Sequence, residues 1–543
     1  MTPIRPDEGC SSRPDRHGLA SGFLKSVEAF PERPALVVDN ETYSYRQLFD
    51  ISNRIAGCID AFANGAPGLT AVLAQRSATA YAGTLAALIA GTGYVPLNPR
   101  FPVARLRAML SSSGSRILVV GSEAAFHLPE LLTAPTPDLL VIAPHLAGLD
   151  ELRSAWPRHV FMDGTATAHG IRHPAAPSRI AYLLFTSGST GEPKGVPIAH
   201  ENVRPYLDYV CERYEITERD RFSQMFDATF DLSVHDMFVC WERGACLHTV
   251  PERSVMAPAK FIREHELTMW FSVPSVAALM SRMRLLTAGT FPSLRYSLFC
   301  GEPLPAVLAE AWQIAAPNST VENLYGPTEA TIAISHYRWQ QDVSPAQSTN
   351  GIVPIGWPFA GQKAQVFDAD GRPTPRSQTG ELWLAGSQVT DAYWENPQRT
   401  KAQFVRAADG SGPWYRTGDL ARLDAMACLH YAGRLDQQVK VRGHRVELQE
   451  VEAVLRSVTG AAEVAAVAWP VHHGSADGII AFVTGIGMPD VDTCLNACRL
   501  RLPEYMVPRA VHFLPEFPLN ANGKIDRAQL ISLLTHSGAK LNS

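Results

Sequence analysis

A loop rich in glycine and hydroxyl side chains, placed directly after an apolar run, constrains this chain most. Residues 182–200 read YLLFTSGSTGEPKGVPIAH. Glycines let successive backbone N–H groups turn toward one anion, while the hydroxyls add donors and the lysine adds positive charge. We therefore expect a strand followed by a phosphate-binding loop. Its expected ligands are Thr186, Ser187, Gly188, Ser189, Thr190, Gly191 and Lys194.

The loop differs from the Walker A type, because no Gly-Lys-Ser/Thr closes it at the spacing G-x-x-x-x-G-K-[ST]. Clusters of Gly, Ser and Thr between regular elements are often plain surface loops. The order Thr-Ser-Gly-Ser-Thr-Gly-x-Pro-Lys-Gly after a buried strand favours phosphate binding here.

This loop resembles the signature of the adenylate-forming superfamily, which includes acyl- and aryl-CoA synthetases, adenylation domains of nonribosomal peptide synthesis, and luciferases. Further segments resemble the motifs of that superfamily in the same order, and the resemblance covers about residues 25 to 527. Residue 98 is Asn where the family commonly has Asp. The segments are GYVPLNP at 93–99, NLYGPTE at 323–329, YRTGD at 415–419, GRLDQQVKVRG at 433–443 and PLNANGKIDR at 518–527.

The length and the residue pattern indicate an α/β protein of more than one domain. A chain of 543 residues with 46% hydrophobic content exceeds what one core usually supports. Short β-branched runs alternate with helical periods up to about residue 350, where shorter strands punctuated by Gly and Pro begin. Near Asp436 the sequence pattern changes again, to a charged, β-rich segment that is followed by the acidic start of a helix.

These changes, together with the resemblance, predict a division into a tail and two domains. Residues 1–20 are expected to be a flexible tail. Residues 21–435 are expected to form a large N-terminal domain of layered α/β subdomains with a β-rich subdomain, holding the ATP and amino-acid sites. Residues 436–543 are expected to form a small, mobile α+β lid.

Particular elements are also predicted. Helices are expected over Tyr45–Phe62, Ala78–Ala90 and Glu447–Ser457, with a final helix at about Asp490–Leu502. Strands are expected over Ala35–Asp39, Thr70–Gln75, Arg116–Gly121, Leu139–Ala143, Ala364–Asp368, Glu381–Ala385, Leu429–Ala432, Ala461–Pro470 and Gly478–Thr484. The stretch Gln438–Val446 is also expected to be β-rich.

The NLYGPTE and YRTGD motifs carry groups suited to a nucleotide. Tyr325 offers a ring for stacking on adenine, Glu329 offers a hard oxygen ligand for Mg²⁺, and Asp419 offers two acceptors to a ribose diol. By resemblance, Asn323 reads the adenine amino group and Arg434 also reaches the ribose. The nucleotide site implied by the resemblance further includes Gly301, Glu302, Gly326 and Thr328.

The last two motifs imply catalysis by a moving lid. By resemblance Asp436 is the hinge, and Lys524 is the catalytic residue that the lid carries to the reacting carboxylate and α-phosphate. An ammonium there would offset the repulsion of two anions and stabilise the pentavalent transition state. A lysine in an Asn-Gly turn is otherwise normally exposed to solvent, and text such as 433–443 is otherwise typical of a solvated charged strand.

Asp231, in the segment FDLSVHDMF at 230–238, indicates which branch of the superfamily the chain resembles. In members that activate amino acids, this position is an aspartate that pairs with the substrate ammonium group. A buried carboxylate without a cation costs several kcal/mol, so its presence favours an amino substrate. The alternative is that Asp231 caps a helix that starts at Leu232.

The resemblance also implies a set of side-chain pocket positions. Apart from Asp231 it holds no acid that would pair with a basic side chain, and its polar members are His235, Ser272 and Cys300. We therefore expect a small or medium, neutral or weakly polar amino acid, such as serine, cysteine, alanine or diaminopropionate; a β-amino acid remains open. The implied positions are Asp231, Leu232, His235, Ser272, Leu298, Cys300, Leu324, Ile332, Ala333 and Lys524.

Bulk properties narrow the partners and location. The net charge is -5 and no basic run is interleaved with aromatics, so nucleic acid is not expected. The nine cysteines form no C-x-x-C pair, which disfavours disulfides and a zinc site and suits a reducing cytoplasm. The longest apolar stretch, about residues 81–96, is interrupted by glycines and too short for a membrane span, and the N-terminus lacks a signal-peptide core.

Together these features predict an ATP- and Mg²⁺-dependent ligase that releases pyrophosphate and forms an aminoacyl-AMP. Only 19 residues follow Lys524, too few for a carrier domain, so transfer to a phosphopantetheine thiol on a separate carrier protein is expected, as in natural-product biosynthesis. The need for a small accessory activating protein stays open. Two rival readings remain: a carboxylic-acid:CoA ligase of the same fold, and an inactive homologue that serves as a binding module.

Overall fold

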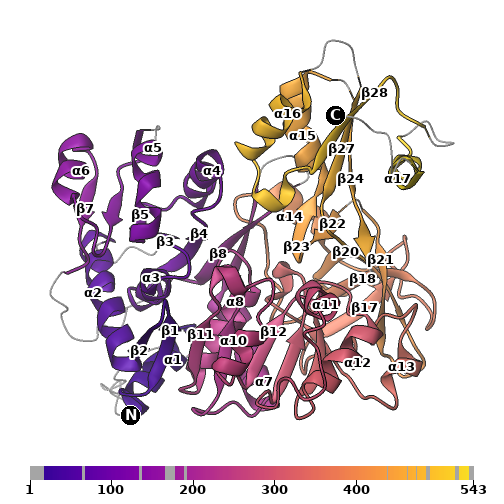
Figure 1. Ribbon diagram of the computed structural model, residues 1–543, viewed down its shortest axis with the longest axis horizontal. Helices are drawn as coiled ribbons and strands as arrows, with labels where there is room; N and C mark the ends of the chain where they lie inside the picture. Colours follow the sequence, from indigo (N-terminus) through magenta and orange to yellow (C-terminus); the bar gives the residue numbers. More distant parts are fainter. Residues whose placement is uncertain are drawn as a thin grey trace, which may run out of the picture.

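The computed structural model describes residues 18–63, 68–133, 137–165, 178–188, 193–436, 438–461, 463–472, 474–484, 489–519 and 525–536. These residues form a large N-terminal body built on three sheets and a smaller C-terminal body built on two (Figure 1). The predicted layered α/β architecture with a small α+β C-terminal domain is confirmed.

The first sheet has seven strands, in the order β7-β6-β5-β3-β4-β8-β9, and is parallel except for the last pair. Its strands are β3 (Leu69–Leu73), β4 (Gly93–Leu97), β5 (Ile117–Val120), β6 (Leu140–Ile142), β7 (Val160–Met162), β8 (Ile180–Thr186) and β9 (Lys194–Ala199). The helical segments along this part are α1 (Ser21–Ala29), α2 (Tyr45–Ala63), α3 (Ala78–Ile89), α4 (Val103–Ser113), η1 (Ser122–His127), α5 (Leu128–Thr133) and α6 (Leu149–Ala155).

The second sheet has nine strands, in the order β16-β15-β14-β13-β12-β10-β11-β1-β2. Its strands are β1 (Pro34–Val38), β2 (Glu41–Ser44), β10 (Arg221–Gln224), β11 (Cys246–Thr249), β12 (Met269–Ser272), β13 (Tyr296–Phe299), β14 (Thr320–Tyr325), β15 (Ser335–Arg338) and β16 (Trp357–Pro358). Its helical segments are α7 (His200–Arg213), α8 (Leu232–Val234), the π-helical turn η2 (His235–Val239), α9 (Cys240–Glu242), η3 (Glu252–Ser254), α10 (Ala259–Glu264), α11 (Pro274–Arg282), α12 (Ala306–Ala315), η4 (Thr328–Ala330) and α13 (Ser344–Gln347).

The third sheet is the predicted β-rich subdomain and is antiparallel throughout. It contains β17 (Lys363–Phe367), β18 (Gly380–Ala385), β19 (Phe404–Val405), β20 (Trp414–Leu423) and β21 (Leu429–Arg434), with α14 (Pro397–Gln403) beside it. One hydrophobic core is shared by all three sheets, and α2, α3 and α7 also contribute to it. The other face of the nine-stranded sheet is covered by α10, α11 and α12, and that of the seven-stranded sheet by α4 and α5.

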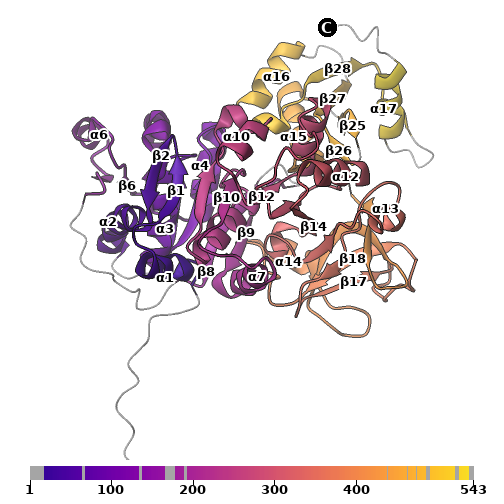
Figure 2. The same cartoon turned by 60° about the horizontal axis from the view of Figure 1, so that its bottom comes forward.

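The chain changes sheets between Arg434, the end of β21, and Gln438, the start of β22. From there, one small sheet holds β22 (Gln438–Val441), β23 (His444–Glu447), β25 (Val471–His472) and β26 (Ser475–Ala476), and the other holds β24 (Val464–Ala468), β27 (Ile479–Thr484) and β28 (Ala510–Leu514). The helical segments are α15 (Leu448–Thr459), α16 (Val491–Arg499), η5 (Glu504–Met506) and α17 (Arg527–His536). Figures 1 and 2 place this body above the nine-stranded and five-stranded sheets.

The three-stranded sheet of the C-terminal body, β24, β27 and β28, is covered on both faces, and the two faces pack against different elements. One face packs against α15 and α16 and joins the β22–β23 hairpin in one core. The other face packs against α17 and against Phe517 and Ile525. The hairpin and α17 therefore lie on opposite sides of this small body.

Most of the predicted helices and strands occur within a few residues of the expected bounds. The β-rich stretch predicted at Gln438–Val446 is confirmed. It is a tight hairpin of β22 and β23, because Arg442 and Gly443 both adopt positive φ, 49° and 86°, as a two-residue turn requires. One prediction is wrong. The helix near Asp490 is not the last, since α17 follows it.

Candidate active site

A cavity lies where the carboxyl ends of β13 and β14 meet the predicted phosphate loop and the β22–β23 hairpin. Parallel α/β sheets commonly bind ligands at this edge, because the loops there are free of the core. The cavity gathers predicted residues that are far apart in the sequence. Those that line it are Thr186, Ser187, Asp231, Leu232, Cys300, Gly301, Glu302, Asn323, Leu324, Tyr325, Gly326, Thr328, Asp419 and Arg434.

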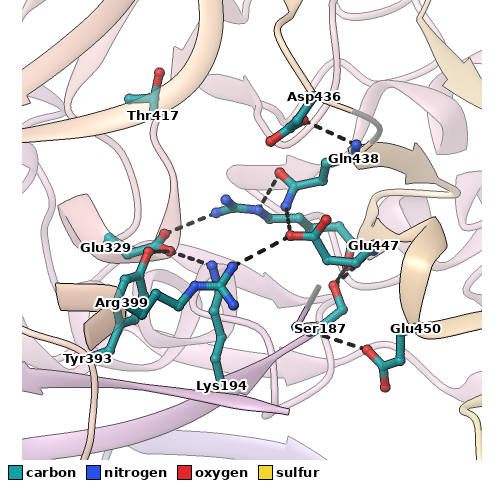
Figure 3. A network of polar contacts seen from close by, with 12 residues as sticks. Ser187, Lys194, Glu329, Tyr393, Arg399, Thr417, Asp436, Gln438, Glu447 and Glu450 are labelled. Carbon is teal, nitrogen blue, oxygen red and sulfur yellow. Dashed lines mark hydrogen bonds and ion pairs between the residues drawn. The ribbon is translucent and has the colours of Figure 1, made fainter. Parts of the chain in front are cut away.

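A buried ion-pair network occupies the phosphate end of the site (Figure 3). The Glu329 carboxylate accepts from Lys194 Nζ at 2.9 Å and from Arg445 Nη1 at 3.0 Å, and Tyr393 donates its hydroxyl at 2.8 Å. Glu329 is fully buried, and Arg445 and Lys194 outweigh its burial and hold the pKa of its carboxyl well below the usual range. Burial lowers the pKa of Lys194 to about 8.

The phosphate loop itself is in contact with the C-terminal body. Ser187 donates its hydroxyl to the Arg445 carbonyl at 2.8 Å, and the Gly188 N–H donates to Glu450 at 3.3 Å. Glu450 also pairs with Arg105 at 2.6 Å, and the two side chains are 1% and 5% exposed. The lid therefore places a carboxylate against an amide of the loop that we expect to hold phosphate. Ser189, Thr190 and Gly191 lie outside the described residues.

The predicted nucleotide end is organised around Asp419. Tyr325 donates its hydroxyl to one Asp419 oxygen at 2.6 Å and Arg434 donates to the other at 2.6 Å. Each carboxylate oxygen has a second lone pair, so a diol can still be accepted. Arg434 also makes a bidentate pair with Asp436, at 2.7 Å for both bonds, and so joins the nucleotide end to the predicted hinge.

Asn323 carries an unsatisfied acceptor at the same end. Its amide nitrogen donates to the carbonyls of Val353 and Pro354 at 3.3 and 2.9 Å. Its Oδ1 is buried and has no hydrogen-bond partner among the described residues. A buried acceptor left open beside a cavity suits a ligand donor, such as an amino group on an aromatic ring.

Asp231 is the group on which the choice of substrate class depends. It is 7% exposed, its Oδ2 has no partner in the described part of the chain, and burial raises the pKa of its carboxyl to about 6. Although it precedes the helical segment that starts at Leu232, its side chain makes no capping hydrogen bond. The side chain therefore does not cap the helix. The carboxyl lines the cavity, where the positive charge of Lys440 offsets part of the effect of burial on its pKa.

Five predicted pocket residues do not line the cavity: His235, Ser272, Leu298, Ile332 and Ala333. Ser272 is the clearest correction. In the sheet it pairs with Phe299 and accepts a hydrogen bond from Trp270, so it lies on the face covered by α11 and α12, away from the cavity. Phe271 takes the cavity-side position in β12, because neighbouring strand residues point to opposite faces.

Sequence reasoning missed the contribution of the hairpin. Lys440 and Arg445, which belong to the C-terminal body, line the cavity, and both side chains are half-buried. Burial lowers the pKa of Lys440 below its usual value. The sequence did show charged residues in this segment, but no local pattern indicates that Arg445 meets a glutamate 116 positions earlier.

Lys524 lies outside the described residues. The residues on either side of its segment are placed: Leu519 and Ile525 form a bridge, and Ile525 packs on the α17 face of the C-terminal sheet. That face is opposite the hairpin that lines the cavity.

Comparison with known proteins agrees with this geometry. The model of the AMP-binding enzyme family matches residues 23–394, and that of the AMP-binding enzyme C-terminal domain matches residues 450–524. The chain belongs to the AMP-binding enzyme family. The resemblance to the adenylate-forming superfamily is thereby confirmed.

Among its relatives, a probable non-canonical nonribosomal peptide synthetase, CymA of Salinispora arenicola, is 34% identical over 94% of this chain and 6% of its own length. A dimodular nonribosomal peptide synthase of Bacillus subtilis is 31% identical over 94% of this chain and 21% of its own. This chain thus spans a small fraction of such relatives. The structure of the Vibrio cholerae adenylation domain AlmE with glycyl-adenosine-5'-phosphate is 32% identical, with a TM-score of 0.87, covering 98% of this chain and 100% of that one.

Among the described residues, no helix is both long enough and apolar enough to cross a membrane.

Proposed function

We propose that this chain forms an aminoacyl adenylate at the cavity described above and then transfers the aminoacyl group to the phosphopantetheine thiol of a separate carrier protein, in natural-product biosynthesis. The observation that carries the amino-acid part is Asp231. Its buried Oδ2 has no hydrogen-bond partner among the described residues, and the carboxylate lines a cavity that also reaches Thr186 and Ser187 of the predicted phosphate loop. An ammonium group bound there would relieve the cost of burying the negative charge.

In the first half-reaction the carboxylate oxygen of the amino acid attacks the α-phosphorus of ATP, and pyrophosphate leaves with the bonding electron pair. Asp231 holds the ammonium, Asn323 Oδ1 accepts from the adenine amino group, and Asp419 accepts from the ribose. Ser187, Gly188 and Lys194 face the phosphates. Lys524 would stabilise the charge that develops on the pentavalent phosphorus.

Glu329 would hold Mg²⁺, which neutralises charge on the triphosphate when it is bound. The residues fit this ion only in part in the described lid orientation, because Arg445 and Lys194 already occupy both Glu329 oxygens. Arg445 is on the lid and leaves with it, which would open one carboxylate oxygen to a hard cation. Adenylation therefore requires another lid orientation.

Ile525, the described residue that follows Lys524, supports the same proposal. It packs on the face of the sheet of β24, β27 and β28 that is opposite the hairpin, so we expect the lid to turn when Lys524 acts at the cavity. We propose that residues 436–543 turn about Asp436 as one lid against residues 21–435. The described orientation, with the hairpin docked, would then serve thiol attack on the acyl carbon and loss of AMP.

The experiment measures the two half-reactions separately. Adenylation is followed by amino-acid-dependent ATP–pyrophosphate exchange, and transfer is followed by mass spectrometry of a phosphopantetheinylated carrier domain, with coenzyme A and a plain carboxylic acid as competing partners. The proposal predicts loading of the carrier and a loss of exchange of about 10²–10³-fold in Lys524→Ala. Preferential use of coenzyme A with a plain acid would instead support the acyl-CoA ligase reading, and absence of ATP binding the inactive homologue.

A further inference from the structure

Three of the predicted side-chain positions line the cavity together with Asp231, and we call these three the floor: Leu232, Cys300 and Leu324. Each is 1–2% exposed and part of the main hydrophobic core, and the other described positions of the predicted set do not line the cavity. All three belong to the N-terminal body, so the floor does not depend on the lid orientation. An amino-acid side chain that enters past Asp231 meets this layer first.

The layer behind the floor is filled on one side by aromatic rings. The His235 ring lies 4.7 Å from Phe271, edge to face, and its Nδ1 is 2.7 Å from the Tyr206 hydroxyl. His235 and Phe271 are 1% and 2% exposed, and burial lowers the pKa of His235 to about 3, so the imidazole is neutral. Ser272 points to the other face of the sheet, and its neighbour Phe271 packs in this core with a large ring.

The opposite side of this layer is held by a strained turn. Thr331 and Ile332 have positive φ, 56° and 72°, which is costly for a β-branched residue. Gln388, 1% exposed, donates to the Ala333 carbonyl at 2.8 Å and accepts from the Thr331 hydroxyl through its own carbonyl. We call these two hydrogen bonds of Gln388 the clamp. They hold the turn that contains Ile332 and Ala333, both of which are fully buried.

This turn also approaches the strand that carries the floor. A Cβ added to Gly326 would lie 2.6 Å from the Ala333 Cα, closer than atoms can pack, so the backbone at the end of β14 touches the clamped turn directly. The aromatic pair, the residues of the turn and the floor belong to one closely packed core, so a deeper pocket would require these buried side chains or the backbone to move.

We propose that this enzyme selects amino acids with the smallest side chains, glycine or alanine, because the pocket past Asp231 ends at Leu232, Cys300 and Leu324. The inference rests on the proposed amino-acid adenylation at this site. It narrows the range expected from residue types alone, in which medium-sized side chains were also accepted. Each methylene beyond alanine should reduce kcat/KM by about 10–200-fold, as in tight apolar pockets.

The test compares glycine, L-alanine, L-2-aminobutyrate, L-valine and L-leucine in ATP–pyrophosphate exchange with the full chain. The proposal predicts the highest kcat/KM for glycine or alanine and a stepwise fall beyond. Leu324→Ala, which deepens the floor, should raise kcat/KM for 2-aminobutyrate or valine relative to alanine by at least tenfold. Leu500→Ala is the matched control, since Leu500 is 71% exposed on the lid, and it should leave the order unchanged.

Two outcomes would overturn the inference: valine or leucine used by the unaltered enzyme as well as alanine, or an unchanged substrate order in a folded Leu324→Ala. The substrate series of the unaltered enzyme decides the question if Leu324→Ala does not fold. Failure of the proposed function looks different, because no amino acid of any size would support exchange while a plain carboxylic acid would.

Discussion

Arg445 on the lid hairpin donates to the buried Glu329 carboxylate at 3.0 Å, on the oxygen that Lys194 does not take. One carboxylate thus binds a fixed lysine of the N-terminal body and a movable arginine of the lid. When Arg445 leaves, the buried carboxylate keeps Lys194 as its cation and has one oxygen open. That oxygen can take another cation in place of Arg445.

The first prediction concerns Arg445. Arg445→Ala removes the lid cation from Glu329 and weakens docking of the hairpin, so transfer to the carrier should fall by about 10²-fold while exchange is affected less. Single-turnover transfer from preformed aminoacyl adenylate measures the first quantity and ATP–pyrophosphate exchange the second. Equal losses in both assays would show that the Glu329 contact does not distinguish the two lid orientations.

The second prediction concerns the Arg105–Glu450 pair, which fastens α4 to α15 beside Gly188. Arg105→Ala removes a buried ion pair between the two bodies and should weaken docking of the lid, by up to about 3 kcal/mol. The protease susceptibility of the 434–438 connection should rise as the lid detaches. Arg179→Ala is the matched control, because its pair with Glu201 is about 60% exposed and contributes little. An unchanged rate of proteolysis in Arg105→Ala would show that the Arg105–Glu450 pair does not hold the lid in its docked position.

The third prediction concerns the tip of the hairpin. Gly443 has φ 86°, and a Cβ at this position would lie 2.7 Å from the Val273 side chain in the N-terminal body. Gly443→Ala should therefore strain the turn and push the hairpin away from the cavity, slowing transfer more than exchange. Gly460→Ala is the control, since Gly460 also has positive φ but an added Cβ would have open space around it. A similar loss of transfer in both variants would assign the effect to backbone strain alone.

The fourth prediction concerns pH. Burial raises the pKa of Asp231 from 3.8 to about 6, so between those values the folded state holds a proton that the unfolded state releases. Ionising the buried carboxyl therefore lowers the free energy of unfolding. This loss is absent below about pH 4, grows as the pH rises to about 6, and is constant above that. Asp231→Asn should therefore raise the free energy of unfolding at pH 8 by on the order of 2 kcal/mol, and less at pH 4. Denaturant unfolding at the two pH values measures this; equal changes would contradict it.

Contiguous motifs were the part of the site that sequence could predict. Asn323, Tyr325 and Asp419 stand in short segments whose local turns fix their direction, and the structure brings them to one cavity. The face of the sheet on which Ser272 lies could not be predicted, since a shift of one residue in a strand moves a side chain to the other face. The contact of Arg445 with Glu329 could not be predicted either, because it depends on how the two bodies dock. The helix α17 was missed because its residues, Arg527–His536, have almost no amphipathic period.

The most direct test of the central claim, that Asp231 selects an amino substrate, compares ATP–pyrophosphate exchange with the best amino acid and with its α-hydroxy analogue, in the unaltered enzyme and in Asp231→Asn. The account predicts that the unaltered enzyme prefers the amino acid by 10²-fold or more, and that Asp231→Asn loses most of this preference while still binding ATP. An equal preference in both proteins would contradict the account, because the ammonium group would then be recognised elsewhere.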